Sequence, residues 1–403
     1  PLKVLRDNWS LVLLFIFSLL LFTRGLNIHG LEYRDDEIFY FQSTQEMLRD
    51  GNYLSPTYFG ENRFQKPILF YWFILAFYKL FGVSWFAARL SAAIFGALTV
   101  SLTWMFARDL LNRKAAWMSS CILMTVPLFF RHAKNAVPDM PLTFFITLSC
   151  YAAYWFIRSH HPNSERQHLA NRFDLIFFIS CALGFMIKGF AAYIIPVFTM
   201  LAYAVVTRRF SVIGRFRYVR GVIITLLIIL PWFLYMLHTH GAEYLGYMVN
   251  TETKDRLIGG EEASWVGMFI SNMGFYLVTL LSYFAPWTIF GLLAIPLAIY
   301  NIVRKNGRSD SLIFLLAWFF STFFFFSCMS FTINHYMMSL ASGFVMLISF
   351  FLLEGFNGHD LGSRIVHHGR KWFLIFLFVV SGVAYAFLVV FLLGGSKLLL
   401  LPL

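Results

Sequence analysis

Long hydrophobic stretches alternate with short polar segments along almost the entire chain. Many of the stretches reach or approach the roughly 17–25 residues that an α-helix needs to cross a bilayer. None shows the two-residue alternation that is typical of a barrel strand. The pattern therefore predicts an all-α polytopic membrane protein with about 11 or more transmembrane helices. The predicted spans lie near residues 10–26, 86–107, 115–131, 139–157, 174–188, 190–206, 221–237, 273–300, 311–328, 336–353 and 372–394.

Composition agrees with this pattern, since 59% of the residues are hydrophobic, 20% are aromatic and only 13% are charged. Such a chain is not a soluble globular protein. Its net charge of +12 has a sufficient source in the excess of Lys and Arg in cytoplasmic loops, so no nucleic-acid partner is inferred. The four cysteines lie in or beside apolar runs and are interpreted as packing residues without a disulfide framework: Cys121, Cys150, Cys181 and Cys328.

The charges of the loops predict the orientation of the chain. If residues 67–81 do not cross the bilayer, about 19 of the 32 Lys and Arg fall on the side of the N-terminus, against about nine on the other side. If they did cross, this bias would reverse. We therefore expect a cytoplasmic N-terminus with an uncleaved first span. We expect residues 67–81 to form a helix in the outer interface, anchored by Tyr71, Trp72 and Tyr78.

This orientation brings the ionisable groups of several chain regions to the outer face. The loop 27–82 carries three consecutive acids, Asp35, Asp36 and Glu37. Acids at the start of a helix are common for electrostatic reasons alone. The functional alternative is that Asp36 or Glu37 acts as a general base on an acceptor hydroxyl, because neighbouring carboxylates raise each other's pKa.

Further candidates stand at the ends of predicted spans. Asp139 follows Pro138, where it either caps a helix or presents a carboxylate to a cavity. Lys66 and Lys188 are either snorkelling lysines or phosphate ligands. Arg256, in a second outer loop over 238–272, is a candidate to assist them, and so is Arg131.

The metal signal is weak. His335 lies between two spans, where a lone histidine is more often structural than a ligand. The loop 238–272 has no His and Glu spacing of a known zinc motif. The sequence therefore assigns no cofactor, and a divalent metal stays an alternative that it does not indicate. No phosphate-binding glycine loop or nucleophile elbow is found either.

A series of motifs in the first loop and the following span resembles a known family. The series begins with Asp36-Glu37 and Tyr40. It then runs through Asp50-Gly51-Asn52-Tyr53, Lys66-Pro67-Ile68-Leu69-Phe70-Tyr71-Trp72 and Ala88-Arg89-Leu90-Ser91. It is similar to the GT-C membrane glycosyltransferases, in the branch of protein O-mannosyltransferases and bacterial 4-amino-4-deoxy-L-arabinose transferases acting on lipid A. Weaker matches follow at Asp139-Met140-Pro141-Leu142, Ile187-Lys188-Gly189, Pro231-Trp232, Tyr247 with Glu252 and Arg256, and Tyr336.

The resemblance implies a GT-C fold and a single transmembrane glycosyltransferase domain over 1–403, with a C-terminal soluble domain absent. It also implies an inverting enzyme that takes a sugar from a polyprenyl-phosphate donor on the periplasmic side of a bacterial inner membrane. The acceptor would be a lipid of the lipid A or lipopolysaccharide type, or another glycan, among the surrounding membrane lipids. Asp36 would be the base, with Glu37 and Asp139 beside it, and the donor phosphate would lie at Lys66, Lys188 and Arg256. The remaining substrate contacts would come from Asp35, Tyr40, Tyr71, Glu252, His335 and Tyr336.

Departures from the family pattern limit what the resemblance specifies. Phe39 stands where the arabinose-transferase branch usually has Arg, and Thr332 stands where a Lys is common. Gln65 replaces a Glu and Thr253 replaces a His, which removes a pair that could hold a metal. The sequence therefore names neither the sugar nor a bound ion.

Two alternatives remain open. One is a protein O-glycosyltransferase of the same fold. The other is a membrane transporter or lipid flippase, a class in which broken helices are common; Gly184, Gly189 and Pro196 could break the region 174–206.

Overall fold

The computed structural model describes residues 2–27, 35–160, 169–254, 265–304 and 309–354. The chain divides into two compact units, Pro1–Ser349 and Phe350–Leu403. Of the second unit, the described ranges include only residues 350–354, the end of one helix. The predicted span 372–394 lies outside the described residues.

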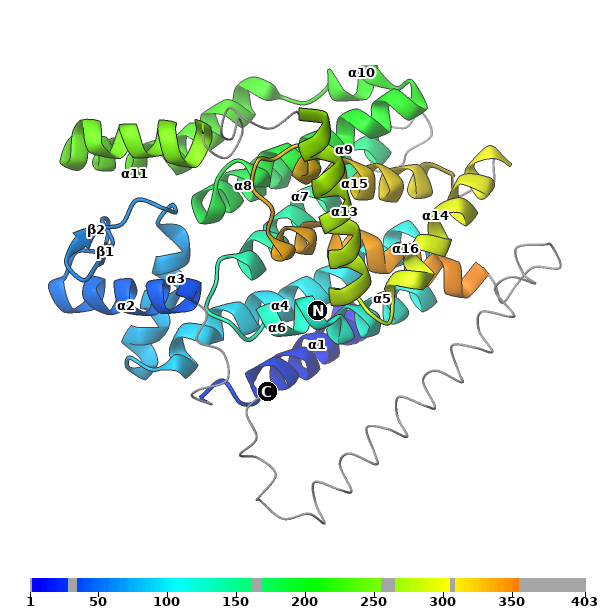
Figure 1. Cartoon of the computed structure of the whole chain (residues 1–403). Coiled ribbons are helices and arrows are strands. Elements are labelled where there is room, and N and C mark those ends of the chain that lie inside the picture. The colour runs from blue at the N-terminus through cyan, green and yellow to red at the C-terminus, as the bar shows by residue number, and fades with distance from the viewer. Residues whose placement is uncertain (1, 28–34, 161–168, 255–264, 305–308, 355–403) are drawn as a thin grey trace, which may run out of the picture. The chain divides into compact units, whose positions relative to one another are not determined.

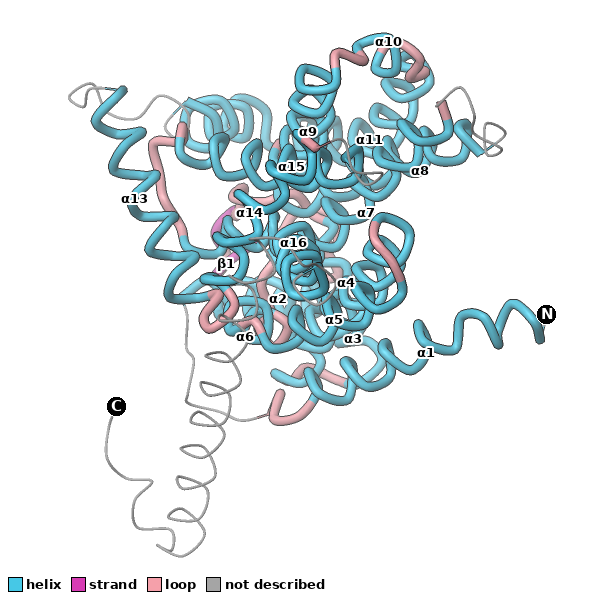
Figure 2. The backbone as a smooth tube through the Cα atoms, turned by 90° about the vertical axis from the view of Figure 1, so that its right-hand side faces the viewer, coloured by secondary structure: helices cyan, strands magenta, loops and turns pink. Residues whose placement is uncertain are grey.

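Helices make up most of the described ranges, and strands are confined to one short hairpin (Figure 2). This confirms the predicted all-α class. The first half of the described chain contains α1 Leu2–Thr23, α2 Asp35–Asp50, β1 Thr57–Tyr58, β2 Glu61–Asn62, α3 Leu69–Phe81, α4 Trp85–Leu110, α5 Arg113–Thr125, α6 Pro127–His132, α7 Asp139–Ser159 and α8 Ala170–Lys188. The second half contains α9 Ala191–Thr207, α10 Phe210–Ile213, α11 Tyr218–Gly246, the π-helical η2 Tyr247–Lys254, α13 Trp265–Tyr283, α14 Thr288–Val303, α15 Ser309–Ser327, the 3₁₀-helical η3 Asn334–Leu340 and α16 Ala341–Glu354.

Seven helical segments of the described ranges are long and apolar enough to cross a membrane, and four shorter apolar helices accompany them. This number of candidate spans confirms a polytopic membrane protein. The shorter helices include α3, for which the sequence predicts an interfacial position, and α14.

Two predicted spans are each broken into two helices. The span 115–131 becomes α5 and α6, because Pro127 forces the preceding Val126 into an extended conformation (φ −66°, ψ 118°). The span 273–300 becomes α13 and α14, separated by a turn that contains Pro286. A proline inside a helix removes one backbone hydrogen bond and clashes with the preceding turn, so these two continuous spans were wrong.

Side-chain hydrogen bonds hold α13 and α14 in place on either side of the second break. The Asn272 amide of α13 donates to the carbonyl oxygens of Ser327 and Met329, just after α15 ends. The indole of Trp287, at the start of α14, donates to Thr125 Oγ1 at the end of α5 (2.9 Å). Helix α13 therefore lies across the end of α15, and in Figure 1 it runs transverse to α11 and α4.

Close contacts between helices fix the end of α8, which carries a candidate site residue. A side chain at Gly184 would bring its Cβ within 2.8 Å of the Ala192 Cβ, so glycine lets α8 and α9 approach each other. Gly189 then ends α8 with a φ of +85°, a conformation that glycine adopts without strain. Lys188 is the last residue of α8, directly before this turn.

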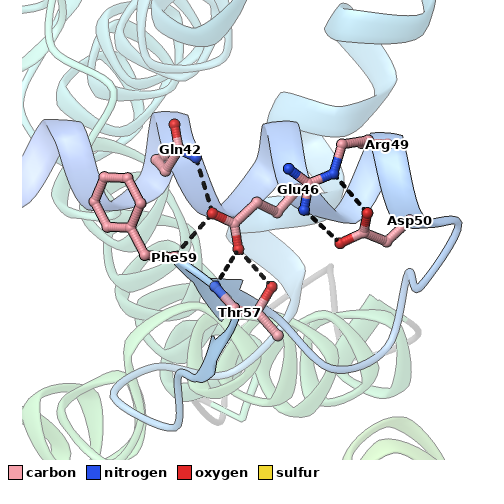
Figure 3. Close-up of polar contacts among 7 residues, drawn as sticks. Gln42, Glu46, Arg49, Asp50, Thr57 and Phe59 are labelled. Carbon is pink, nitrogen blue, oxygen red and sulfur yellow. Dashed lines mark hydrogen bonds and ion pairs between the residues drawn. The ribbon is translucent and has the colours of Figure 1, made fainter.

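The loop that follows α2 is held by one buried carboxylate (Figure 3). Glu46 accepts hydrogen bonds from Gln42 Nε2 (2.8 Å), Thr57 Oγ1 (2.7 Å), and the backbone amides of Phe59 (2.9 Å) and Gly60 (3.2 Å). These bonds tie the β1–β2 hairpin to the helix before it. The hairpin thereby fixes where the chain re-enters the helical core at Lys66.

The aromatic residues of α3 do not all take the interfacial role that the sequence predicts. Tyr71 and Tyr78 are 0% and 2% exposed. The Tyr71 ring packs 5.2 Å from Tyr40, and the Tyr78 ring packs 5.8 Å from Phe41, both of α2. The prediction that Tyr71 and Tyr78 are membrane-surface anchors is therefore wrong, because their rings form the interface between α2 and α3.

Candidate active site

A cavity of about 290 Å³ lies where five separate chain segments meet. The segments are the loop before α3, the start of α7, the α8–α9 junction, η2, and the region from the end of α15 to η3. Its walls are mainly apolar and include Leu142, Phe185, Ile194, Phe325, Phe326 and Met329. Its polar lining includes Lys66, Asp139, Lys188, His335 and Tyr336.

Asp139 is the centre of the polar end of this cavity. Its Oδ1 atom lies 2.6 Å from Lys188 Nζ and 3.6 Å from His335 Nε2. The Lys188 ammonium also lies 5.5 Å from the ring centroid of Tyr336. The N-cap position of α7 is Pro138 and Asp139 is the first residue inside the helix, so of its two predicted roles the structure favours the carboxylate that faces a cavity.

Lys66 reaches the same cavity from the first loop. The residues before it are firmly packed: Arg63 donates from Nε to the Tyr71 hydroxyl (3.0 Å) and lies over the Phe39 ring at 4.4 Å. The loop therefore brings one cation to the cavity from residue 66 and α8 brings another from residue 188. The predicted substrate residue Tyr71 lies behind the loop and supports it.

The first predicted outer loop contacts the end of α11, where the second predicted outer loop begins. Ser55 Oγ and His240 Nε2 are 2.7 Å apart, and the Trp232 indole donates to the Leu54 carbonyl oxygen (2.9 Å). Phe64 packs edge-on against the ring of the same histidine. Residues 54–64 and the end of α11 therefore share one side of the molecule, as the loop charges predict.

Asp36 is exposed at the start of α2 and is not among the residues that line the cavity. Tyr40, four positions further along α2, is buried. Burial chiefly raises the pKa of Tyr40 well above its usual value; the charges of Asp139 and Asp36 add to this rise, whereas Arg63 opposes it. The predicted base Asp36 thus lies outside the set of residues that line the cavity with Lys66, Asp139 and Lys188.

Glu37 occupies a different environment from its neighbour. Its two oxygens accept from Arg89 Nε (2.7 Å) and Nη2 (2.9 Å), and Oε1 also accepts from the Ala136 amide (2.7 Å). The side chain is 1% exposed. This bidentate ion pair gives Glu37 a structural role, because both of its oxygens already have partners and it does not line the cavity.

Three predicted site residues cannot be placed. Arg256 lies outside the described residues, and the side chains of Asp35 and Glu252 are likewise not described. The structure also places His132 next to the predicted site residue His335, although the sequence analysis did not single out His132. Its buried ring lies 5.5 Å from that of His335. It stands seven positions before Asp139, on another helix, and no spacing motif marks this pair.

Comparison with known proteins agrees with the helical architecture. Residues 8–240 match the family model described as dolichyl-phosphate-mannose-protein mannosyltransferase. This match covers more than half of the chain. The chain belongs to this family.

Several curated relatives are named as bacterial arabinosyl transferases. One from Pseudomonas fluorescens Pf-5 is named undecaprenyl phosphate-alpha-4-amino-4-deoxy-L-arabinose arabinosyl transferase 1; it is 32% identical over 79% of this chain and 55% of its own length. The corresponding protein of Pseudomonas fluorescens Pf0-1 is 29% identical over 82% of this chain and 56% of its own length. The chain thus spans about half the length of these relatives.

Solved structures show the same fold. ArnT from Cupriavidus metallidurans, in complex with undecaprenyl phosphate, superposes with a TM-score of 0.72 at 22% identity, over 85% of this chain and 59% of ArnT. The archaeal oligosaccharyltransferase AglB from Archaeoglobus fulgidus, in complex with an inhibitory peptide and a dolichol-phosphate, superposes with a TM-score of 0.54 at 14% identity. This superposition covers 88% of this chain and 51% of AglB. The predicted GT-C fold is therefore confirmed.

Proposed function

We propose that this chain is the membrane-embedded part of an inverting glycosyltransferase. It takes a sugar from a polyprenyl-phosphate donor and transfers it to a lipid acceptor of the lipid A or lipopolysaccharide type. The names of its relatives support this reaction, since they are transferases of undecaprenyl-phosphate-linked aminoarabinose. The ligand of ArnT, undecaprenyl phosphate, supports the donor class.

The observation that carries the proposal is the placement of two lysines in one apolar cavity. Lys66 and Lys188 line it from different segments, and the surrounding walls are aromatic and aliphatic. A polyprenyl phosphate needs both properties, because its isoprenoid chain prefers apolar walls and its phosphate is bound by ammonium groups. Lys188 also holds Asp139, so its charge is partly balanced when no phosphate is present.

The proposed chemistry is a single displacement at the anomeric carbon of the donor sugar. The acceptor oxygen forms a bond to this carbon while the bond from carbon to phosphate oxygen breaks, and the electron pair leaves with the phosphate. Lys66 and Lys188 stabilise the charge that develops on the leaving phosphate. Asp36 takes the proton of the acceptor hydroxyl. One displacement inverts the configuration of the anomeric carbon.

We further propose that the reaction takes place on the periplasmic side of a bacterial inner membrane, with the N-terminus in the cytoplasm. The charge bias of the loops supports this orientation. The contact between residues 54–55 and the end of α11 supports a common side for both loops.

A transfer assay tests the proposal. The purified protein is reconstituted in liposomes with a radiolabelled undecaprenyl-phosphate sugar and either a lipid A fraction or an acceptor peptide. We expect transfer to the lipid fraction. We expect Lys66→Ala to lower the affinity for the donor at least about tenfold, because it removes one phosphate contact. The control Lys114→Ala removes an exposed lysine at the start of α5 and should leave the affinity unchanged.

Two results would contradict the proposal. Equal donor affinity in Lys66→Ala and Lys114→Ala would remove the phosphate role of residue 66. Transfer to the peptide alone would instead identify a protein O-glycosyltransferase. The absence of transfer to either acceptor would reject both glycosyltransferase functions.

A further inference from the structure

A cluster of two histidines and one carboxylate lies at the polar end of the cavity. One ligand atom from each of His132, Asp139 and His335 lies within 4.8 Å of the other two. The residues come from three separate segments, α6, α7 and η3. His132 and Asp139 are 1% and 5% exposed, so the cluster is shielded from solvent.

The hydrogen bond of His132 favours metal binding. Its Nδ1 atom lies 2.9 Å from the backbone carbonyl oxygen of Leu128. A carbonyl oxygen only accepts, so Nδ1 carries a proton, and in the neutral imidazole the lone pair is on Nε2. This is the arrangement that orients histidine ligands in metal sites, where the second ring nitrogen donates to a carbonyl or carboxylate.

The donor set indicates the kind of ion. Two imidazole nitrogens and one carboxylate oxygen suit Zn²⁺ and related divalent transition metals, whereas Mg²⁺ and Ca²⁺ prefer oxygen ligands alone. At bond lengths of about 2.0–2.1 Å, tetrahedral ligands lie about 3.3 Å apart. No pair of these atoms would therefore have to approach by more than about 1.5 Å, which side-chain rotation can supply.

We propose that His132, Asp139 and His335 bind a divalent transition-metal ion, with Zn²⁺ as the first candidate. Asp139 and His335 also line the cavity, so a fourth coordination position opens toward it, and a phosphate oxygen can fill that position. The site uses neither Gln65 nor Thr253, the two positions at which the sequence lacks the Glu and His that could hold a metal. Metal binding itself does not depend on the proposed sugar transfer.

Lys188 competes with the metal ion for the carboxylate of Asp139. Its ammonium lies 2.6 Å from Asp139 Oδ1, where its charge repels a divalent cation. A carboxylate has lone pairs on both oxygens, so Asp139 can accept from the lysine and bind the ion at once. Removing the charge of Lys188 should therefore strengthen metal binding.

Cobalt spectroscopy tests the site without any sugar donor. Metal-stripped protein in detergent is titrated with Co²⁺, whose visible absorption becomes strong in a tetrahedral site, and bound Zn²⁺ is counted by elemental analysis after dialysis. We expect one equivalent to bind. We expect His335→Gln and His132→Gln to weaken binding at least about tenfold, and Lys188→Met to strengthen it at least about tenfold.

A matched control comes from the chain itself. His160 has the same arrangement as His132, with Nδ1 2.9 Å from the carbonyl oxygen four residues earlier, but it is not part of the cluster. His160→Gln should bind Co²⁺ as the unchanged protein does. Thermal unfolding of each variant separates loss of the site from loss of the fold, and His335→Gln keeps the test informative if His132→Gln does not fold.

Three results would overturn the proposal. The first is the absence of Co²⁺ absorption in the unchanged protein. The second is equal Co²⁺ affinity in folded His335→Gln and His160→Gln. The third is an octahedral Co²⁺ spectrum that none of the substitutions changes. Inorganic phosphate should shift the spectrum of the bound Co²⁺, and an unchanged spectrum would contradict the open fourth position. None of these readouts involves sugar transfer, so a failure here leaves the transfer assay to be judged by itself.

Discussion

Glu37 and Asp139 are both buried carboxylates paired with a cation, yet their surroundings differ. Glu37 faces the planar guanidinium of Arg89 and one backbone amide, which occupy both of its oxygens. Asp139 faces a flexible ammonium and a histidine on one oxygen and lies on the wall of a cavity. A bidentate pair fixes two elements in place, whereas a single lysine contact leaves room for another ligand.

This difference teaches that burial and ion pairing do not by themselves identify a functional carboxylate. The sequence predicts catalytic roles for both residues, because both are acids near the same predicted face. The two residues differ in whether both carboxylate oxygens already accept hydrogen bonds from structural partners. The predictions below test which carboxylates of this region are structural and which act in transfer.

The largest effect is expected for Glu37→Gln. It leaves the Arg89 guanidinium buried without its counter-charge, which costs about 3–5 kcal/mol of unfolding free energy. Thermal unfolding in detergent measures the loss. Glu61→Gln, an exposed position of β2, is the control and should be neutral.

A second substitution separates structure from catalysis at this pair. The double variant Glu37→Gln with Arg89→Met should regain a large part of the lost stability, because no unpaired charge remains. If Glu37→Gln keeps its stability and loses only transfer activity, then Glu37 is catalytic and the comparison fails.

The next effect is expected for Asp36→Asn. If Asp36 is the base, Asp36→Asn should lower the transfer rate about a hundredfold. Because Asp36 is exposed, the substitution should change the free energy of unfolding little. Rates with a saturating hydroxyl acceptor provide the measurement. Asp50→Asn, at the other end of α2, is the matched control. Full activity of Asp36→Asn would show that another group takes the proton.

A smaller effect is expected for Glu46→Gln. The carboxylate loses its charge while the donors around it in Figure 3 remain. Hydrogen bonds to a charged group contribute about 1.5–3 kcal/mol each, and glutamine retains part of them, so a loss of about 1–3 kcal/mol follows. Faster proteolysis within residues 51–66 would measure it; an unchanged cleavage rate would show that the hairpin does not need this charge.

The smallest effect is the pH dependence of the same contact. Burial alone would raise the pKa of Glu46, but the hydrogen bonds from Thr57, Gln42, Gly60 and Phe59 lower it below its usual value. A lowered folded-state pKa gives stability that is present above about pH 4.3, the unfolded value, and is lost as the pH falls through the folded value. Unfolding between pH 7 and pH 3 should therefore show an acid loss that Glu46→Gln lacks. Equal pH dependence in both proteins would assign the loss to other groups.

Sequence reasoning predicted a large part of the fold, because its signal is local. Each span is a continuous apolar run that satisfies its own backbone hydrogen bonds, so hydropathy is sufficient to find it. Pro127 and Pro286 mark the two breaks locally, but hydropathy predicts continuous spans over 115–131 and 273–300 because both flanks of each proline are apolar.

The sequence by itself determined that this is a polytopic helical protein with Asp139, Lys66 and Lys188 at one face, since length, hydropathy and charge bias depend on neighbouring residues. Only the tertiary structure decided that those three residues share one cavity, that Glu37 forms an ion pair with Arg89, and that His132 lies beside His335. The physical reason is that such contacts join residues separated by tens to hundreds of positions. Their geometry is set by how the helices pack, which no local pattern records.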